Sequence, residues 1–472
     1  MPNIKKNLFF SILLTVANYL FPFLTYPYVS RILGVANIGA CNFTDSVINY
    51  FILFSMLGID TLGVREIARH KGDRESLNKA FSNLFLVNII LTATMLVVLV
   101  VLTFTVPKFA EHKDLMFFGA FKLVFNSLLV EWVYKGLEEF KYISLRSIAV
   151  KTLYVVSVFL FVRKREDLWI YYMLSCMMVV VNALVNIVMS RSKVRLQFRG
   201  LELSATFKSL LVIGLYAILT SMYTTFNVLF LGFAAGETQV GLYTTATKLY
   251  GMIMALFTAF TGVMIPRMSN LVSGGEMEQF RTYYGKAVDY LFAFSFPVII
   301  WMVMMAPDIV RVISGPEFGE AVKPMLIIAP LIFVIGYEQI LVLQTLLPLG
   351  KDKLLLRNSA IGAVTGICLN LLLVPVLMAV GSALVWIISE LLILVLSQVA
   401  VKKEISIGFP FPLTGKNILE YLPLAALLFL CANLHIGVFP RLLVSMAVSA
   451  VYVFLIQLFV NKRNIVSLFL KR

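Results

Sequence analysis

Residues 354–401 read LLLRNSAIGAVTGICLNLLLVPVLMAVGSALVWIISELLILVLSQVAV, 48 residues with only two charged side chains, Arg357 and Glu390. A helix needs about 20 apolar residues to cross the hydrocarbon core of a bilayer. The run is therefore too long for one span, and the residues from Pro375 to Gly381 are where the chain can turn. The stretch predicts a transmembrane hairpin and so an integral membrane protein.

The composition of the whole chain agrees with this hairpin. Apolar residues make up 60% of the 472 residues and charged residues 14%, with a mean hydropathy of +0.91. An average soluble protein has about 45–50% apolar and about 25% charged residues. A soluble fold of this size would leave large apolar patches exposed to water. We therefore expect most of the chain to lie in the bilayer.

The charge and the rare residues exclude several other classes of protein. The net charge of +15 is spread between apolar runs, which favours anionic membrane lipids over nucleic acid as the partner. The four cysteines lie in apolar stretches, and the three histidines have no second ligand at metal spacing. No phosphate-binding loop motif and no long polar connection occur. We expect no cofactor, no metal site and no catalytic site outside the membrane.

The apolar runs predict about fourteen spans and both termini on the cytoplasmic side. With that orientation, and with residues in the first four positions of a span counted in the adjoining connection, 28 of the 40 Lys and Arg residues fall in inside connections, nine in outside ones and three deeper within spans. This bias is what the positive-inside rule requires. The predicted spans are 8–30, 42–63, 80–106, 115–134, 143–162, 168–190, 209–233, 241–265, 286–306, 324–347, 354–376, 380–401, 417–435 and 440–460.

An internal repeat indicates how the spans are grouped. At an offset of 202 residues, Gly34 aligns with Gly236 and Gly39 with Gly241 without a gap. We interpret this as a duplicated lobe of six spans, with residues 1–200 as the first copy. Residues 201–403 would be the second copy, and residues 404–472 would add two helices. Six spans are an even number, so both copies keep one orientation and enclose a central cavity.

Polar side chains recur at helical spacing in the spans that are predicted to line this cavity. Asn18 and Thr25, seven residues apart, share one face of the first span. Polar faces inside a membrane avoid lipid, although small and hydroxyl residues also serve close helix packing. The predicted polar lining comprises Asn18, Thr25, Asp45, Asn49, Thr220, Thr224, Asn227 and Thr244.

Ionisable residues within the spans are costly, at least about 2.5 kcal/mol each on insertion scales, and each needs water or a partner. Asp45 is equivalent to residue 247 by the repeat, so we expect Asp45 and Lys248 to face each other across the cavity. Snorkelling to the interface is the alternative for Lys122 and Lys151. Arg31, at the end of the first span, would reach either cargo or a lipid headgroup. The candidates for binding a coupling ion are Asp45, Asp289, Glu338 and Glu390.

Two stretches carry a resemblance to a known family. The segment YPYVSRILGVANIGACNFTDSVINYFILFSMLGIDTLGVREIAR resembles the opening of bacterial polysaccharide repeat-unit flippases. VGLYTTATKLYGMIMALFTAFTGVMIPRMSNL looks like the eighth span of the same family. These flippases belong to the multidrug/oligosaccharidyl-lipid/polysaccharide exporter superfamily. The resemblance covers nearly the whole chain.

The resemblance implies an all-α, V-shaped fold of two six-helix lobes and a flippase that works by alternating access. The implied cargo is an undecaprenyl-diphosphate-linked oligosaccharide, moved to the outer leaflet of the bacterial cytoplasmic membrane for surface polysaccharide synthesis. A polysaccharide polymerase machinery would be a further partner. Such flippases have a cationic cavity, which Arg31, Lys122, Lys151 and Lys248 would supply here.

Three other functions compete with this one. A drug or cation antiporter of the same superfamily would need an acidic residue in the first span, but no Asp or Glu occurs before Asp45. A membrane glycan polymerase or glycosyltransferase would need a sizeable outer loop with catalytic residues, which the chain lacks. A purely structural or receptor role leaves the polar faces unexplained.

Overall fold

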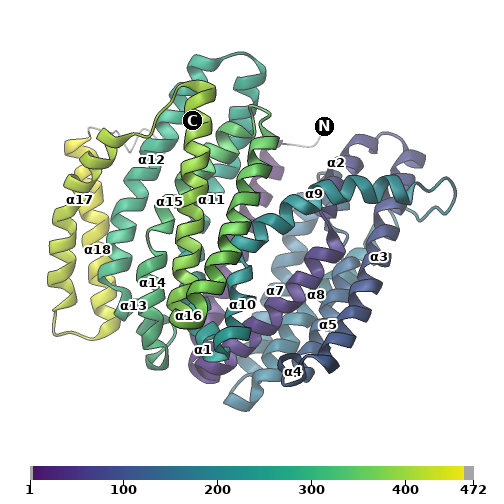
Figure 1. The fold of residues 1–472 in the computed structure, drawn as a ribbon, viewed down its shortest axis with the longest axis horizontal. Coiled ribbons are helices and arrows are strands. Elements are labelled where there is room, and N and C mark those ends of the chain that lie inside the picture. Colours follow the sequence, from purple (N-terminus) through teal and green to yellow (C-terminus); the bar gives the residue numbers. More distant parts are fainter. Residues whose placement is uncertain (1–3, 462–472) are drawn as a thin grey trace. The chain divides into compact units, whose positions relative to one another are not determined.

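The computed structural model describes residues 4–461, and every regular element within them is a helix (Figure 1). The chain forms two compact units, Met1–Gly241 (unit 1) and Leu242–Arg472 (unit 2). An all-helical membrane fold is therefore confirmed. The predicted boundaries at residues 200 and 403 derive from the repeat and remain a prediction.

Unit 1 is built around a long first helix, α1, which is broken at Gly34 (φ 78°, ψ 173°). The region of positive φ favours glycine because it has no side chain to clash with the backbone. The helices of unit 1 are α1 (Ile4–Met56), α2 (Ile59–His70), α3 (Arg74–Thr105), α4 (Pro107–Ala110), α5 (Lys113–Ser127), α6 (Glu131–Gly136), α7 (Phe140–Phe161), α8 (Leu168–Ser190), α9 (Leu203–Thr224) and α10 (Phe226–Ala235), with a 3₁₀ turn η1 (Arg165–Asp167) before α8.

The two halves of α1 pack against different partners. The first half runs parallel to α7, as two contacts near its ends show. The Ser144 hydroxyl donates to the Phe10 carbonyl (2.6 Å), and the Tyr28 hydroxyl donates to the Val162 carbonyl (2.8 Å). The second half runs antiparallel to α9 and α10. There the Tyr50 hydroxyl donates to the Ser221 carbonyl (3.0 Å). The predicted first and second spans are thus separate elements joined at Gly34.

The repeat-equivalent turns share one backbone conformation. Gly236 (φ 83°, ψ 177°) has nearly the same dihedral angles as Gly34. The segments that follow contact each other reciprocally: a Cβ on Gly39 would overlap the Glu237 carbonyl, and one on Gly241 would overlap the Val35 carbonyl. Residues 35 and 237, like 39 and 241, are 202 positions apart. The two turns therefore pack as copies related by a local two-fold axis.

The helices of unit 2 begin with α11 (Glu237–Ser273), whose first turn belongs to unit 1. The others are α12 (Met277–Met304), α13 (Ala306–Ile313), α14 (Val322–Ile328), α15 (Leu331–Leu341), α16 (Asp352–Ile405), α17 (Phe411–Ala432) and α18 (Val438–Leu455), with short turns η2 (Pro316–Ala321), η3 (Val342–Leu346) and η4 (Ile456–Val460).

The hairpin predicted from residues 354–401 is confirmed in α16. Its helical course breaks at Met378 (φ 52°, ψ −126°), between Pro375 and Gly381. The Lys351 ammonium lies 2.7 Å from the Glu404 carboxylate, whereas the ends of a straight helix of this length would be about 80 Å apart. Figure 1 shows the two arms of α16 joined at one end.

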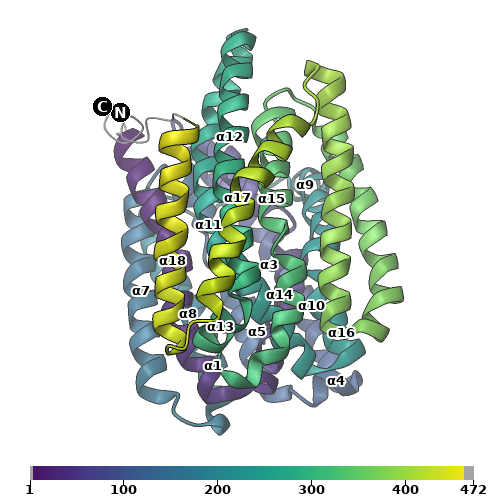
Figure 2. The ribbon, with the colours of Figure 1, turned by 90° about the vertical axis from the view of Figure 1, so that its left-hand side faces the viewer.

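The last two helices pack on α12 and α13. The Trp301 indole N–H donates to the Ser445 hydroxyl (2.9 Å). The Arg441 guanidinium makes two hydrogen bonds to the Asp308 carboxylate (2.5 and 2.7 Å). Figure 2 shows α17 and α18 side by side at the face nearest the viewer.

Counting helices gives fewer candidate spans than the predicted fourteen. Within residues 4–461, ten helices are long and apolar enough to cross a membrane, or twelve if each of two bent pairs is one span. Two of the ten, Leu13–His70 and Asp352–Ile405, exceed 50 residues and contain the breaks described above. Fourteen spans therefore remain a prediction.

Candidate functional site

Three polar side chains of unit 1 form a closed group, here called the Asp45 triad. The Lys122 ammonium, on α5, donates to the Asp45 carboxylate (2.6 Å) and to the Asn49 carbonyl oxygen (3.0 Å). The Asn49 amide N–H₂ donates to the second Asp45 oxygen (3.0 Å). Asp45 and Asn49 are four residues apart on α1 and so share a face. The triad pairs one cation with one anion and is neutral.

The triad gives Asp45 partners that were not expected from the sequence: its carboxylate oxygens accept hydrogen bonds from Lys122 and Asn49. Snorkelling, the alternative considered for Lys122, is not what the structure has, because the Lys122 ammonium is held in an ion pair within the unit. The expectation that Asp45 and Lys248 face each other across the cavity remains a prediction.

A second group, here called the Arg146 cluster, joins α6, α7 and α8. The Arg146 side chain is only 5% exposed, and its guanidinium lies 2.5 Å from the Glu131 carboxylate. It also donates to the Asn186 side-chain oxygen, which accepts from the Tyr142 hydroxyl (3.2 Å). The Glu131 carboxylate is shared with Lys135 (3.7 Å). A buried charge is tolerated only when it is paired and hydrogen-bonded in this way.

Sequence reasoning missed Arg146. The charge count assigned it to the connection before the fifth span, although the run RSIAVK places it five residues before Lys151. The structure has both residues on one helix, α7. An arginine in an otherwise apolar stretch near Glu131 was the available signal.

Lys151 is a cation of α7 that forms no ion pair with a carboxylate among the described residues. Its ammonium donates to the side-chain oxygen of Asn18, which is exposed on the first half of α1. In the described part of the chain Lys151 forms no ion pair, because the nearby Glu131 is already shared by two cations. Lys151 is half-buried. The Lys151–Asn18 pair therefore has an uncompensated positive charge within a span.

The hydroxyl groups predicted to line the cavity in unit 1 mostly donate hydrogen bonds to backbone carbonyl groups of their own helices. The Thr25 hydroxyl is buried and donates to the Phe21 carbonyl (3.1 Å), and Thr224 donates to the Thr220 carbonyl (2.9 Å). Such bonds go with close helix packing. Arg31 is exposed, and its guanidinium donates to the Pro27 carbonyl one turn earlier (3.3 Å). The lining role of these residues remains a prediction, as it does for Asn227, which is buried on α10.

Four predicted residues of unit 2 lie on three helices. Thr244 is buried and Lys248 half-buried, both on α11, and Asp289 is half-buried on α12. Glu390, on α16, is buried and accepts a hydrogen bond from the Trp386 indole N–H (3.0 Å). Their roles as cargo or ion ligands remain predictions.

Glu338 is the partner of Glu390 in unit 2. The two carboxyl groups, from α15 and α16, lie beside each other. Of the four predicted coupling residues, the structure thus brings two together. It places Asp45 in a different group and Asp289 on a third helix.

One group of described residues has metal-ligand atoms close together: Glu111, His112 and Glu237, within 4.8 Å of one another. The Lys108 ammonium already lies 2.5 Å from Glu237 and 3.2 Å from Glu111. The His112 ring nitrogen is 3.0 Å from the same Glu237 oxygen. An ammonium occupies the place that a metal cation would need, so the group is an ion-pair cluster that holds the start of α11 on unit 1.

The chain matches the family described as "Polysaccharide biosynthesis protein" over residues 4–272. Among curated proteins, it is 25% identical over 399 residues to a putative O-antigen transporter of Escherichia coli, covering 83% of this chain and 95% of that protein. It is also 25% identical over 214 residues to the probable flippase AglR of Haloferax volcanii, covering 45% and 44% of the two chains.

Solved structures share the fold. The lipid II flippase MurJ in an inward closed conformation matches with a TM-score of 0.77 at 13% identity, over 96% of this chain and 99% of that one. An inward-facing multidrug resistance MATE family transporter of the MOP superfamily matches with a TM-score of 0.65 at 17% identity, over 83% and 94%. Matches at identities this low establish a common fold, but they carry no information on whether the cargo is the same.

Proposed function

We propose a function on the premise that this chain belongs to the polysaccharide biosynthesis protein family: it is a flippase that moves lipid-linked oligosaccharides across a membrane. The observation that carries the proposal is the match along 83% of the chain to a putative O-antigen transporter. The match to a probable flippase and the fold shared with a lipid II flippase support it. The cargo class comes from these relatives, and the residues below concern how such a cargo is held.

The cargo we propose is an undecaprenyl-diphosphate-linked repeat unit, moved by alternating access from the inner to the outer leaflet of a bacterial cytoplasmic membrane. The excess of Lys and Arg in alternate connections supports cytoplasmic termini. Surface polysaccharide polymerisation would use the product, which makes the polymerase machinery a proposed partner. In this role the chain needs no catalytic residue, because no covalent bond changes.

The first proposed ligand of the diphosphate is Lys151, with Asn18. A lipid-linked diphosphate must carry two or more negative charges through hydrocarbon, so it needs cations that are not already neutralised. Lys151 has that property, and charge-assisted hydrogen bonds to phosphate oxygens are strong. Asn18 would supply an amide donor beside it. Lys248 and Arg31 are proposed as further cations.

Lys122 has a weaker claim to the diphosphate. Its charge is neutralised by Asp45, so binding phosphate would first require breaking a 2.6 Å ion pair. We propose that the Asp45 triad presents amide and carboxylate groups to the sugars, because Asn49 is exposed. The Glu338–Glu390 pair is the proposed site of a coupling ion, since the two carboxyl groups lie together within the spans of unit 2.

A drug or cation antiporter is the second candidate, because MATE transporters share the fold. Against it stands the first half of α1, which has no Asp or Glu before Asp45. The glycan polymerase or glycosyltransferase is not favoured, because the named relatives are transporters and flippases.

The test is complementation of a bacterial strain that lacks its repeat-unit flippase, with surface glycan detected on intact cells. The flippase proposal expects restored glycan and no gain in resistance to cationic drugs. Drug resistance without glycan would instead establish the antiporter. Glycan that accumulates inside the cell while the protein is present at normal abundance would contradict the flippase proposal for that cargo.

A further inference from the structure

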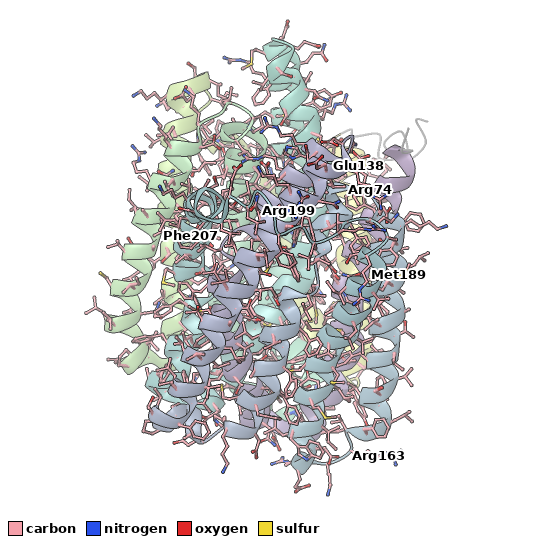
Figure 3. All side chains as sticks on the ribbon, turned by 90° about the vertical axis from the view of Figure 1, so that its right-hand side faces the viewer. Arg74, Glu138, Arg163, Met189, Arg199 and Phe207 are labelled. Atoms are coloured by element: carbon pink, nitrogen blue, oxygen red, sulfur yellow. The ribbon has the colours of Figure 1, made fainter. Side chains whose placement is uncertain are left out.

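Residues 191–202, here called the interface segment, connect α8 to α9 without forming a helix beyond the first turn. Both neighbouring helices are membrane-span candidates, so no residue of the segment is more than about six positions from a span end. Figure 3 shows Arg199 at the same end of unit 1 as Arg74 and Glu138, with Arg163 at the opposite end. The segment therefore lies at headgroup depth at one end of unit 1.

The interface segment is fixed on α3 by side chains that bind its backbone. The backbone N–H groups of Arg195, Gln197 and Glu202 donate to the side chains of α3, each at 2.8 Å. The Glu202 carboxylate is 2.6 Å from the Lys79 ammonium. The three acceptors on α3 are Asn78, Ser82 and Asn83, in that order. The segment is thus held on α3 by its backbone, and the N–H groups of Arg195 and Gln197, two residues apart, both point to α3 as in an extended chain.

Extended backbone sends successive side chains to opposite sides, so Val194, Leu196 and Phe198 share one side and Arg195 and Arg199 the other. The first side is apolar: Val194 is buried, whereas Leu196 is 47% exposed and Phe198 70% exposed. A rigidly held phenylalanine with most of its surface uncovered would be unfavourable in water.

Three charged side chains of the segment are cations without an ion-pair partner among the described residues. Arg191, Arg195 and Arg199 are exposed, and none of them forms an ion pair within residues 4–461. By contrast, Lys193 pairs with Glu139 and Lys79 with Glu202. Three free guanidinium groups therefore flank the two exposed apolar side chains.

We propose that the interface segment binds anionic lipid headgroups, with the three arginines on lipid phosphates and with Leu196 and Phe198 among the upper acyl chains. Charge complementarity favours this occupant, because guanidinium groups match phosphate geometry and each basic residue near an anionic surface adds attraction. An acidic protein would satisfy the arginines, but it would not require apolar side chains at the depth of the span ends. The proposal is independent of the flippase assignment.

The first test uses Phe198→Trp as a local reporter, with the four native tryptophans replaced by Phe, in vesicles that contain lipids brominated on the acyl chain. Bromine quenches tryptophan only at short range. We expect stronger quenching when the brominated lipid is phosphatidylglycerol than when it is phosphatidylcholine at the same mole fraction. Equal quenching by the two lipids would overturn the headgroup preference. Absence of quenching would overturn the proposal entirely and leave an aqueous protein partner.

The second test removes the cations in this reporter background. Arg191→Gln, Arg195→Gln and Arg199→Gln together should abolish the preference for phosphatidylglycerol. Each arginine is expected to contribute about fivefold, so the three together weaken anionic lipid binding on the order of a hundredfold. The matched control, with Gln at Arg163, Lys164 and Arg165, removes the same charge at the other end of unit 1 and should leave the preference intact. If the control abolishes it equally, the effect is one of net charge and the proposal fails.

A third measurement separates loss of binding from loss of folding. None of the three arginine side chains holds the segment on α3, so the triple variant should keep the thermal unfolding midpoint of the wild type. If instead the midpoint falls and the quenching is lost with it, Arg195→Gln alone is tested. A folded Arg195→Gln variant that keeps the full lipid preference would contradict the role of that arginine.

Discussion

Two lysines within the spans of unit 1 differ in what surrounds them, although both were expected to be cavity cations. Lys122 is neutralised by Asp45, whereas in the described part of the chain Lys151 bonds to the Asn18 amide oxygen and to no carboxylate. An ion pair that is already formed lowers the attraction for a third charge. The difference separates a residue that maintains the unit from one that is available to bind an anion.

The first prediction follows from this difference. Lys151→Ala should abolish surface glycan in the complementation assay at normal protein abundance, and Lys151→Arg should retain part of it, because the charge survives with a different geometry. Lys122→Ala should also be impaired, since it leaves Asp45 without its cation. Lys122→Ala combined with Asp45→Asn should recover export. An inactive double variant with normal abundance would show that Lys122 itself binds cargo.

The second prediction concerns the buried Arg146. Arg146→Ala leaves the Glu131 carboxylate and the Asn186 amide without their partner, so we expect a loss of about 3 kcal/mol in the free energy of unfolding. This is the low end for a buried pair, because Glu131 keeps some contact with solvent and with Lys135. Denaturation in detergent would measure it. Adding Glu131→Gln should regain part of the loss, and no regain would argue against the ion pair as the source.

At the scale of the single element, the hairpin α16 shows how a turn is built from a long apolar run. At the open end of the hairpin, the two arms meet through the ion pair of Lys351 with Glu404. Further along, the Asn358 amide of one arm donates to the Ser397 hydroxyl of the other (3.4 Å). At the closed end, Gly381 lies where a Cβ would be 2.6 Å from the Leu373 carbonyl oxygen. The closed end is therefore packed by backbone against backbone.

The third prediction is that Gly381→Ala destabilises the protein by about 1–3 kcal/mol, because overpacking forces the two arms apart. Gly415→Ala is the matched control. Gly415 also lies in a helix, α17, but no atom lies within 4 Å of a Cβ built there. The control should be neutral or slightly stabilising, by up to about 1 kcal/mol. Equal loss in both variants would rule out the close approach as the cause.

The fourth prediction concerns the start of α3 and its dependence on pH. The Asp73 carboxylate accepts hydrogen bonds from the Ser76 hydroxyl and from the backbone N–H groups of Ser76 and Glu75. These bonds lower the pKa of Asp73 below its usual value. A carboxyl group with a depressed pKa in the folded state stabilises it above the unfolded pKa, and this is lost as pH falls through the folded pKa.

The protection of the first turn of α3 against hydrogen exchange, taken relative to the intrinsic exchange rate at the same pH, should therefore fall at acid pH. In Asp73→Asn the side-chain oxygen still caps the helix but does not titrate, so this loss of protection should be absent at that turn. A variant that shows the same acid-dependent exchange as the wild type would contradict the cap as its source.

Sequence reasoning succeeded where the deciding property is local and failed where it depends on distant neighbours. The hairpin of residues 354–401 follows from apolar length and from its turn residues. The pairing of Asp45 with Lys122 joins residues 77 positions apart, and no periodicity encodes that contact. Arg146 was assigned to a connection because an arginine opposes burial in a membrane. Only the fold shows that Glu131 and Asn186 offset its cost.

At the scale of the whole molecule, the orientation of the chain still rests on the placement of its charges. Residues 163–165 carry three cations in a connection that the count puts outside, against the general bias. Figure 3 shows Arg163 at the opposite end of unit 1 from Arg74, so the two ends face different sides of the membrane.

The fifth prediction is that Lys164→Cys reacts with an impermeant thiol reagent in intact cells and that Lys71→Cys does not. Both positions are exposed, so accessibility within the protein is matched. Permeabilised cells should label both variants, which serves as the control. The opposite pattern in intact cells would place the N-terminus outside and invert the proposed direction of export.

The reciprocal packing of the two glycine turns has a consequence for ancestry. A contact in which Gly39 meets residue 237 and Gly241 meets residue 35 has the symmetry of a homodimer interface, in which one mutation changes both halves at once. Joining two copies in one gene removes that restriction, because each copy then mutates alone. The two sides of this interface accordingly differ in chemistry. Glu237 pairs with Lys108 and His112, whereas Val35, its equivalent in the other copy, is apolar. On the predicted duplication, fusion would let one side of a symmetric interface acquire an ion pair that a homodimer would have to form twice.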